Sequence, residues 1–232
     1  MKILFVAADP MEFRGMTRQL ADIRPAPLAV DWARAGKLGG NGVLLVANGA
    51  GWKPAAAATD AGIEHFVPDV VVSTGYCGAL DEKLKIADVV VATEIWVAGL
   101  PGNPTQTAAL KEKRGDGPIC SIDHVARTAE EKQRLRGFGG CAVEMEAAGV
   151  GERAKAASLP FYCVRAVTDA AHENMTNDFD SALRGDGHFD TMLIFKGVLR
   201  HPRARIPELV RLGFRCARAS RSLGEFFADC RF

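Results

Sequence analysis

Apolar positions along the chain fall into short runs separated by turn residues and by stretches of mixed polarity. The runs at residues 2–8, 30–35, 42–48, 68–75, 88–93 and 161–167 predict β-strands. The stretches at residues 11–23, 54–62, 128–135, 142–158 and 178–200 predict helices, and Thr128 supplies a capping signal for the third of them. Residues 94–118 are rich in Gly, Pro and Thr and predict loops. Strands that alternate with helices predict an α/β layered fold with a mostly parallel central sheet.

The carboxyl ends of the predicted strands are candidate positions for a ligand. Parallel sheets bind ligands beyond these ends, which here fall at Ala8, Asn48, Gly75 and Thr168. We therefore expect the functional residues to follow these strands.

Two carboxylates interrupt an apolar stretch at residues 142–149. Glu144 and Glu146 flank Met145, between small residues that otherwise suit a core helix. Burying a carboxylate is costly unless it is paired or binds something. This pair is therefore the first candidate for a binding site.

Composition narrows the class of protein. With 232 residues, 48% of them hydrophobic, and a formal net charge of +1, the chain suits one large globular domain. The near-neutral balance gives no reason to expect nucleic acid as a partner. No apolar run approaches the length of a membrane span, so we expect a cytoplasmic protein. The six cysteines form no CxxC pair, and the histidines lack metal-ligand spacing, so we predict neither a disulfide framework nor a metal site.

Four segments together resemble one known family. They are residues 73–80 (STGYCGAL), 85–90 (KIADVV), 143–147 (VEMEA) and 165–169 (RAVTD). In this order and spacing they resemble the purine nucleoside phosphorylase and nucleosidase superfamily, over most of residues 1–195. The resemblance implies a single three-layer α/β/α domain with a mostly parallel, partly barrel-like mixed sheet. It also implies cleavage of a purine nucleoside without a cofactor, by a homodimer or higher homo-oligomer.

The resemblance assigns the acid of this reaction to Asp169. In the family, an Asp at this position donates a proton to N7 of the purine, helped by a hydroxyl residue that here is Thr168. Such an acid must stay protonated near neutral pH in an enclosed site. The alternative from the residues alone is that Thr168 and Asp169 cap a following helix.

The same resemblance assigns the ribose contacts to the 142–149 segment. Glu146 matches the carboxylate that accepts hydrogen bonds from the ribose hydroxyls, and Met145 matches the residue that lines the sugar face. A negative charge there also favours a cationic transition state. Glu144 is assigned a structural role. The alternative is a solvated helix start with Met145 in the core.

The nucleophile separates hydrolases from phosphorylases. Phosphorylases of this family carry one arginine after the first strand and another before the glycine-rich strand end. This chain has Glu12 and Ser73 at those positions, so two cations for phosphate are missing. In the methylthioadenosine and S-adenosylhomocysteine nucleosidases a glutamate at the position of Glu12 activates water. Arg14 on a turned helix would leave phosphorolysis open, and a first-turn acid favoured by the helix dipole is the structural alternative for Glu12.

Substrate contacts beyond the ribose are less specific. By the resemblance, Ser73, Gly75 and Ala50 line the site, and Val125 stands where the nucleosidases usually stack an aromatic residue on the base. Residues 121–132 also resemble the hopanoid-associated nucleoside phosphorylases, which implies that an apolar 5′ substituent is an open alternative. We therefore expect hydrolysis of an adenosine-type purine nucleoside to free base and a ribose derivative. Phosphorolysis is the first alternative, and a nucleoside-binding protein without catalysis is the second.

The last segment, residues 201–232, lies outside this resemblance. It carries many arginines among Leu, Phe and Ala, and we predict an arginine-rich helical extension of a domain at residues 1–200. An amphipathic helix that touches acidic lipid is one interpretation. A solvated helix or a subunit contact is the favoured one.

Overall fold

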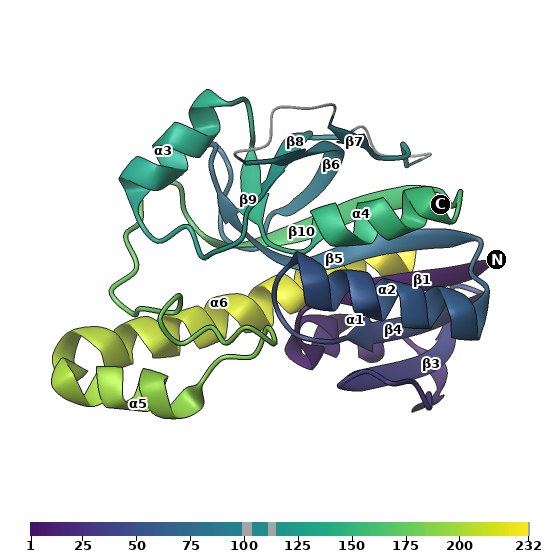
Figure 1. Cartoon of the computed structure of the whole chain (residues 1–232), viewed down its shortest axis with the longest axis horizontal. Coiled ribbons are helices and arrows are strands. Elements are labelled where there is room, and N and C mark those ends of the chain that lie inside the picture. Colours follow the sequence, from purple (N-terminus) through teal and green to yellow (C-terminus); the bar gives the residue numbers. More distant parts are fainter. Residues whose placement is uncertain (99–103, 111–114, 232) are drawn as a thin grey trace.

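A mixed β-sheet runs through the centre of the protein, with helices on both of its faces (Figure 1). The computed structural model describes residues 1–98, 104–110 and 115–231. In chain order the strands are β1 (Lys2–Ala7), β2 (Ala21–Pro25), β3 (Trp32–Leu38), β4 (Asn41–Ala47), β5 (Val70–Ala79), β6 (Val89–Val97), β7 (Thr105–Gln106), β8 (Gly117–Ser121), β9 (Ala142–Glu144) and β10 (Phe161–Asp169).

Part of the sheet closes on itself. The long strand β5 pairs with β10 and β9, and the path continues from β10 through β6 and β8 back to β9, which closes a ring of five strands. On the other side of β5, strands β1 and β4 follow in parallel, and β3 and β2 complete an antiparallel edge. The partly barrel-like mixed sheet expected from the sequence is confirmed.

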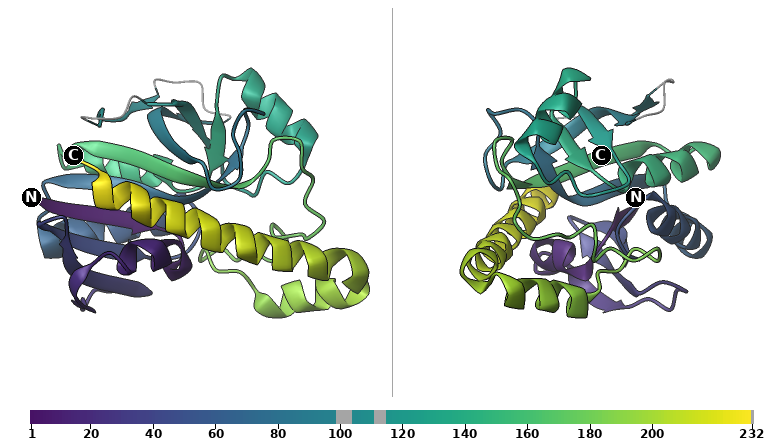
Figure 2. Two further views of the ribbon diagram at one scale, coloured as in Figure 1. Left: turned by 180° about the vertical axis from the view of Figure 1, so that it is seen from behind. Right: turned by 60° about the vertical axis from the view of Figure 1, so that its left-hand side comes forward.

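Helices form two layers. A 3₁₀ turn η1 and six α-helices are described: η1 (Pro10–Phe13), α1 (Arg14–Thr17), α2 (Trp52–Phe66), α3 (Ala129–Gly137), α4 (Ala147–Ala156), α5 (Thr191–Arg200) and α6 (Pro202–Asp229). Helices α2 and α4 cover one face of the sheet, and α6 with η1 and α1 covers the other (Figure 2). The predicted three-layer α/β/α architecture is confirmed.

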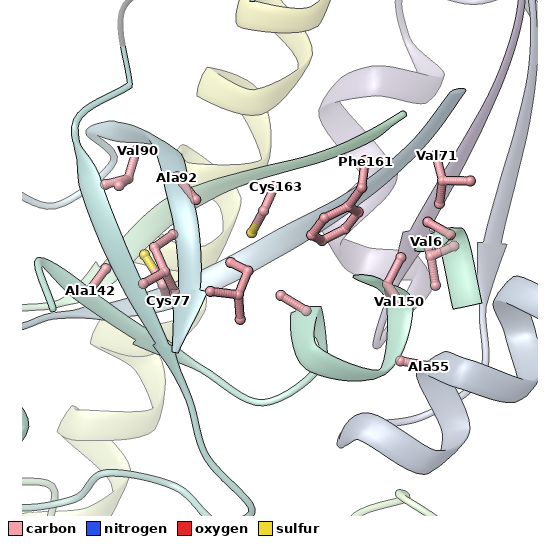
Figure 3. Close-up of a cluster of buried hydrophobic side chains, with 14 of the residues drawn as sticks. Val6, Ala55, Val71, Cys77, Val90, Ala92, Ala142, Val150, Phe161 and Cys163 are labelled. Carbon is pink, nitrogen blue, oxygen red and sulfur yellow. The ribbon is translucent and has the colours of Figure 1, made fainter. Parts of the chain in front are cut away.

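The core beneath α2 and α4 is built from small and β-branched side chains. Val6, Val71 and Phe161 of the sheet face Ala55 and Val150 of these helices (Figure 3). The two helices approach closely because α4 contains Gly149, where an added Cβ would lie 2.1 Å from the carbonyl oxygen of Trp52. A side chain at this position would push α4 away from the start of α2.

Helix α6 covers the N-terminal segments. The Ser220 hydroxyl accepts a hydrogen bond from the Gly15 amide (2.8 Å) and donates one to the Glu12 carbonyl (3.0 Å). The ring of Phe227 packs edge-on against Phe5, with centroids 4.9 Å apart. None of the helices within the described ranges is long and apolar enough to cross a membrane.

Three predicted helices are wrong in extent. The helix expected at residues 11–23 ends after Thr17, and the chain returns as β2, which pairs with β3. The first residues of the predicted 142–158 helix form β9, because this segment pairs with β5 and β8. In the predicted 178–200 helix, only α5 is helical. It begins where Asp190 caps the Met192 and Leu193 amides.

Candidate active site

A cavity of about 450 Å³ opens at the carboxyl ends of β1, β5 and β10. Of the predicted strand ends, Ala8 and Thr168 line it, and Asn48 and Gly75 do not. Its size lies within the range of small-molecule sites. One end holds acidic side chains and the other is apolar. The acidic end is lined by Glu12, Glu144, Glu146 and Asp169, and the apolar end by Met175, Phe179, Phe189, Ile194, Leu209 and Leu212.

Glu12 is fixed by backbone amides. Its Oε2 accepts hydrogen bonds from the Ala8 and Asp9 amides (2.8 and 3.0 Å), and its Oε1 accepts one from the Tyr76 amide (2.8 Å). The carboxylate therefore caps the η1 turn, as the structural alternative proposed, and also lines the cavity. A carboxylate offers about four acceptor positions. Glu12 thus keeps about one for a ligand or water.

Burial raises the pKa of Glu12, although the positive charge of Arg165 and the three amides oppose this shift. Gly75 makes room for the carboxylate. An added Cβ at Gly75 would lie 2.4 Å from Oε1 of Glu12, and its φ of 131° is a backbone conformation that favours glycine. Gly75 therefore leaves space for the Glu12 carboxylate and does not itself line the cavity.

A buried arginine joins the two glutamates of the 142–149 segment. Arg165 of β10 forms an ion pair with Glu144 and lies 3.4 Å from Oε2 of Glu146. Its guanidinium also donates to the Thr74 carbonyl (2.6 Å) and the Ser73 hydroxyl (2.7 Å). Ser73 is therefore a support for Arg165 below the cavity, and not part of the cavity wall.

The two glutamates differ in their environment. Oε2 of Glu144 accepts from the amides of Glu146 and Ala147 (2.9 and 2.8 Å), which fits its predicted structural role. Oε1 of Glu146 accepts from the Gly51 amide (3.1 Å). Burial, together with the neighbouring negative charges, raises the pKa of Glu146 to about 7, although Arg165 opposes this. Glu146 thus titrates near neutral pH.

Asp169 and Thr168 lie together at the end of β10. Oγ1 of Thr168 lies 3.0 Å from Oδ1 of Asp169 and 3.3 Å from the Cys77 carbonyl oxygen. The hydroxyl can therefore donate its hydrogen to Oδ1 of Asp169, with the Cys77 carbonyl oxygen as the other acceptor within reach. The other oxygen, Oδ2, forms an ion pair with Lys132, whose ammonium also donates to the Ala170 carbonyl (2.9 Å).

Burial raises the pKa of Asp169, and the contacts with Lys132 and Thr168 oppose this shift. Lys132 lies on α3 and is completely buried. It was not predicted, since it stands in the charged run of residues 130–136 that is typical of a solvated helix. The only local signal is its position one turn before Leu135, which is also buried.

The remaining predicted contacts fall in two groups. Met145 and Val125 line the cavity, and Val125 is held by a hydrogen bond from its amide to Asp180 (2.7 Å). Ala50 is outside the lining, where its amide donates to the Gly187 carbonyl (2.7 Å). In this loop it is Gly51, one residue later, whose amide contacts Glu146.

Lys132 and Arg165 lie behind the acidic side chains and do not themselves line the cavity. Among the described lining residues there is no lysine or arginine. His124 lines the wall, but its Nδ1 and Nε2 already contact Asp123 (2.7 Å) and Glu131 (2.6 Å). Arg14 is exposed and outside the lining. Within the described ranges no cluster of His, Cys, Asp or Glu could hold a metal ion.

Comparison with known proteins decides the family. A profile described as the phosphorylase superfamily matches residues 2–109 and 104–186, which is most of the chain. The chain belongs to this superfamily. Sequence relatives of this phosphorylase-superfamily protein include a 5′-methylthioadenosine/S-adenosylhomocysteine nucleosidase of Shewanella loihica, 27% identical over 87% of this chain and 100% of the relative. A nucleosidase of the same name from Haemophilus ducreyi is 29% identical over 79% and 91%.

Solved structures share the fold of this superfamily member. A nucleosidase of the same name from S. pneumoniae, with a transition-state inhibitor, has a TM-score of 0.67 and 19% identity, over 96% of this chain and 100% of that chain. A Helicobacter pylori nucleosidase with butyl-thio-DADMe-Immucillin-A has a TM-score of 0.70 and 19% identity, over 97% of both chains. The matched 97% of this chain extends beyond residue 200, so α6 contributes to the shared fold.

Proposed function

We propose that this protein hydrolyses the N-glycosidic bond of a purine nucleoside of the adenosine type. The observation that carries the proposal is the composition of the cavity, in which Glu12, Glu146 and Asp169 converge without a lysine or arginine in the described wall. Acidic surroundings favour a cationic sugar and disfavour a phosphate dianion. The names of the sequence relatives, both nucleosidases, support the same reaction.

Asp169 and Glu12 divide the proton transfers. As the bond between the sugar C1′ and the base N9 breaks, its electron pair moves to the purine, and Asp169 gives its proton to N7. Water attacks C1′ while Glu12, through its remaining acceptor position, takes the proton of that water. Free base and a ribose derivative result. An acid and a base that activates water are the pair used by inverting glycosidases.

The other residues position these groups. Thr168 donates a hydrogen bond to Oδ1 of Asp169, and Lys132 fixes the other oxygen. Glu146 accepts hydrogen bonds from the ribose hydroxyls, and its charge stabilises the sugar cation. Met145 faces the sugar, and Val125 contacts the base. The apolar wall from α5 and α6 suits an apolar 5′ substituent.

One observation favours a different function. The ammonium of Lys132 stabilises the ionised form of Asp169, and an ionised carboxylate cannot act as an acid. If Lys132 keeps Asp169 ionised when the substrate is bound, the protein binds nucleosides without cleaving them. Phosphorolysis has no comparable support. The buried cation Arg165 already donates from Nη1 and Nη2 to protein acceptors, so its guanidinium is not available to bind phosphate.

Product analysis tests the proposal. We would incubate the protein with adenosine, methylthioadenosine, S-adenosylhomocysteine and inosine, with and without phosphate, and identify the sugar product. Base release without phosphate, giving the free sugar, is expected. Release that requires phosphate and yields ribose 1-phosphate would reject hydrolysis. Binding of adenosine in calorimetry with no release in either buffer would instead favour the binding protein.

Assembly and location complete the proposal. We expect a homodimer or higher homo-oligomer that acts in the cytoplasm. Light scattering on the purified protein measures the first, and fractionation of the source cells measures the second. A monomer with full activity would contradict the expected assembly without affecting the proposed chemistry.

A further inference from the structure

Helix α5 and the first half of α6 form a pair that projects beyond the sheet (Figures 1 and 2). Their inner sides are used by the fold. Val198 and Glu208 are buried, and Ile194, Leu209 and Leu212 line the cavity. Glu208 accepts hydrogen bonds from the Thr176 and Asn177 amides, which ties α6 to the preceding loop. The outer sides of the two helices are therefore free to meet another surface.

These outer sides are apolar. The outward stripe, as we name it, consists of six large side chains that are each about half exposed or more, spaced at one-turn intervals on each helix. Phe214 is the most exposed of them, at 71%. The outward stripe comprises Met192, Phe195 and Leu199 on α5, and Ile206, Val210 and Phe214 on α6.

Positive charges border the outward stripe. Residues 191–218 contain seven lysines and arginines and one acid, the buried Glu208. Five of the cations are exposed and form no ion pair with a described residue. They are Lys196, Arg200, Arg203, Arg211 and Arg218. Helices that lie in a membrane interface combine this exposed apolar face with lysine and arginine at its margins.

We propose that the outward stripe binds the surface of an anionic lipid membrane. Its large side chains enter the boundary between headgroups and acyl chains, and the bordering cations contact lipid phosphates. Neither helix spans a membrane, in agreement with a contact confined to the interface. Because Ile194, Leu209 and Leu212 of the same helices wall the cavity, this contact would place the apolar end of the cavity close to the lipid.

The charges also argue against a second copy as the occupant. A two-fold contact places the same patch of two copies face to face. Through the outward stripe, it would place two surfaces that both carry exposed arginines, among them Arg203 and Arg211, against each other. Neither helix offers an unengaged carboxylate to pair with them between residues 191 and 218. A lipid surface supplies these negative charges.

Flotation with vesicles tests the proposal independently of catalysis. The full chain would be mixed with vesicles of phosphatidylcholine alone, or of phosphatidylcholine with phosphatidylglycerol. Three variants would be compared: the double variant Phe195→Ser/Phe214→Ser, the triple variant Arg200→Ser/Arg203→Ser/Arg211→Ser, and Phe138→Ser. Phe138 follows α3, away from the stripe, and is 68% exposed, so it matches Phe214 as a control.

We expect binding to vesicles that contain phosphatidylglycerol, with Phe138→Ser unaffected. Each cation near an anionic surface contributes a factor of about five to binding, so the triple variant should bind roughly a hundredfold more weakly. The apolar double variant should also lose binding, with its melting temperature unchanged.

Absence of binding by the unmodified protein would overturn the proposal, as would equal binding by all variants. Light scattering on the unmodified protein and the variants, without vesicles, tests whether a second copy occupies the stripe. A dimer that dissociates in the apolar double variant would assign the stripe to contact between copies, and would also overturn the proposal.

Discussion

The ammonium of Lys132 lies against the carboxylate of Asp169, and both groups are buried. Removal of one partner from a buried ion pair leaves an uncompensated charge and costs about 3–5 kcal/mol. Asp169 therefore has two coupled roles, one in the fold and one in the proposed chemistry. A substitution of Asp169 alone would mix the two effects.

A double-mutant cycle separates these roles. Asp169→Asn should abolish base release and also lower the free energy of unfolding by about 3 kcal/mol, because Lys132 loses its partner. Adding Lys132→Met should restore most of that stability while activity stays absent. Urea unfolding and a base-release assay measure the two quantities. Activity in the double variant would refute Asp169 as the acid.

Lys132→Met alone tests the positioning role. Without the ammonium, the pKa of Asp169 should rise further, since the contact with Lys132 opposes the rise caused by burial. If Asp169 is the acid, the loss of activity at alkaline pH should move to higher pH, with kcat reduced by poorer orientation. An activity that increases at every pH would show instead that Lys132 blocks the acid.

Gly75→Ala should displace Glu12. The new methyl group would lie 2.4 Å from Oε1, so the carboxylate must leave the Tyr76 amide. We expect a loss of kcat on the order of a hundredfold, similar to removal of a well-placed catalytic group. Gly39→Ala is the matched control, because φ is also positive there (54°) but no atom lies within 4 Å of the added Cβ.

Gly39→Ala should lower the free energy of unfolding by about 1 kcal/mol, because its backbone conformation disfavours alanine, and it should retain activity. Equal kcat values for the two alanine variants would contradict a catalytic role for Glu12.

Glu146→Gln should lower activity while stabilising the unliganded protein. Burial raises the pKa of Glu146 from 4.5 to about 7, so the folded protein binds more protons than the unfolded chain between these values. The free energy of unfolding of the unmodified protein should therefore fall as pH rises through this window, by up to about 3 kcal/mol. In Glu146→Gln, the free energy of unfolding should not show this part of the fall with pH.

Activity provides the second readout for Glu146. In the unmodified protein, kcat/KM should fall as pH drops below about 7, because the ribose carboxylate becomes protonated. Glu146→Gln should reduce kcat/KM by roughly a hundredfold at pH 8, the order of loss for one electrostatic contact with a transition state. If the free energy of unfolding changes with pH in the same way for both proteins from pH 5 to 8, the shifted pKa is refuted.

Strands β1, β3, β4, β5, β6 and β10 were predictable because their apolar runs report burial directly, whereas β2, β7, β8 and β9 lie wholly or partly in segments predicted as helix or loop. Three helices were predicted with the wrong extent, because their ends depend on contacts with residues distant in sequence. Residues 142–144 form a strand only because β5 and β8 offer edges on both sides. Before Asp190, Gly187 has a φ of 85° and lies so close to the Ala50 backbone that only glycine fits, which interrupts the predicted helix.

The site was predictable where a carboxylate follows a predicted strand end, as Glu12 and Asp169 do, or interrupts an apolar stretch, as Glu146 does. All three line the cavity. Lys132 could not be predicted, because its burial depends on how α3 packs against the end of β10. The same limit applies to Ile194 and Leu209, whose helices carry two apolar sides and give no indication of which one meets the cavity.

The hydrogen bond between Gly15 and Ser220 joins residues 205 positions apart in sequence. During synthesis, the first strand and turn therefore emerge from the ribosome long before the helix that shields them. Phe5 and its neighbours therefore stay exposed to solvent until Phe227 and the rest of α6 have been synthesised. We expect the nascent chain to need chaperone protection through most of its elongation, and the native state to form only after translation has passed α6.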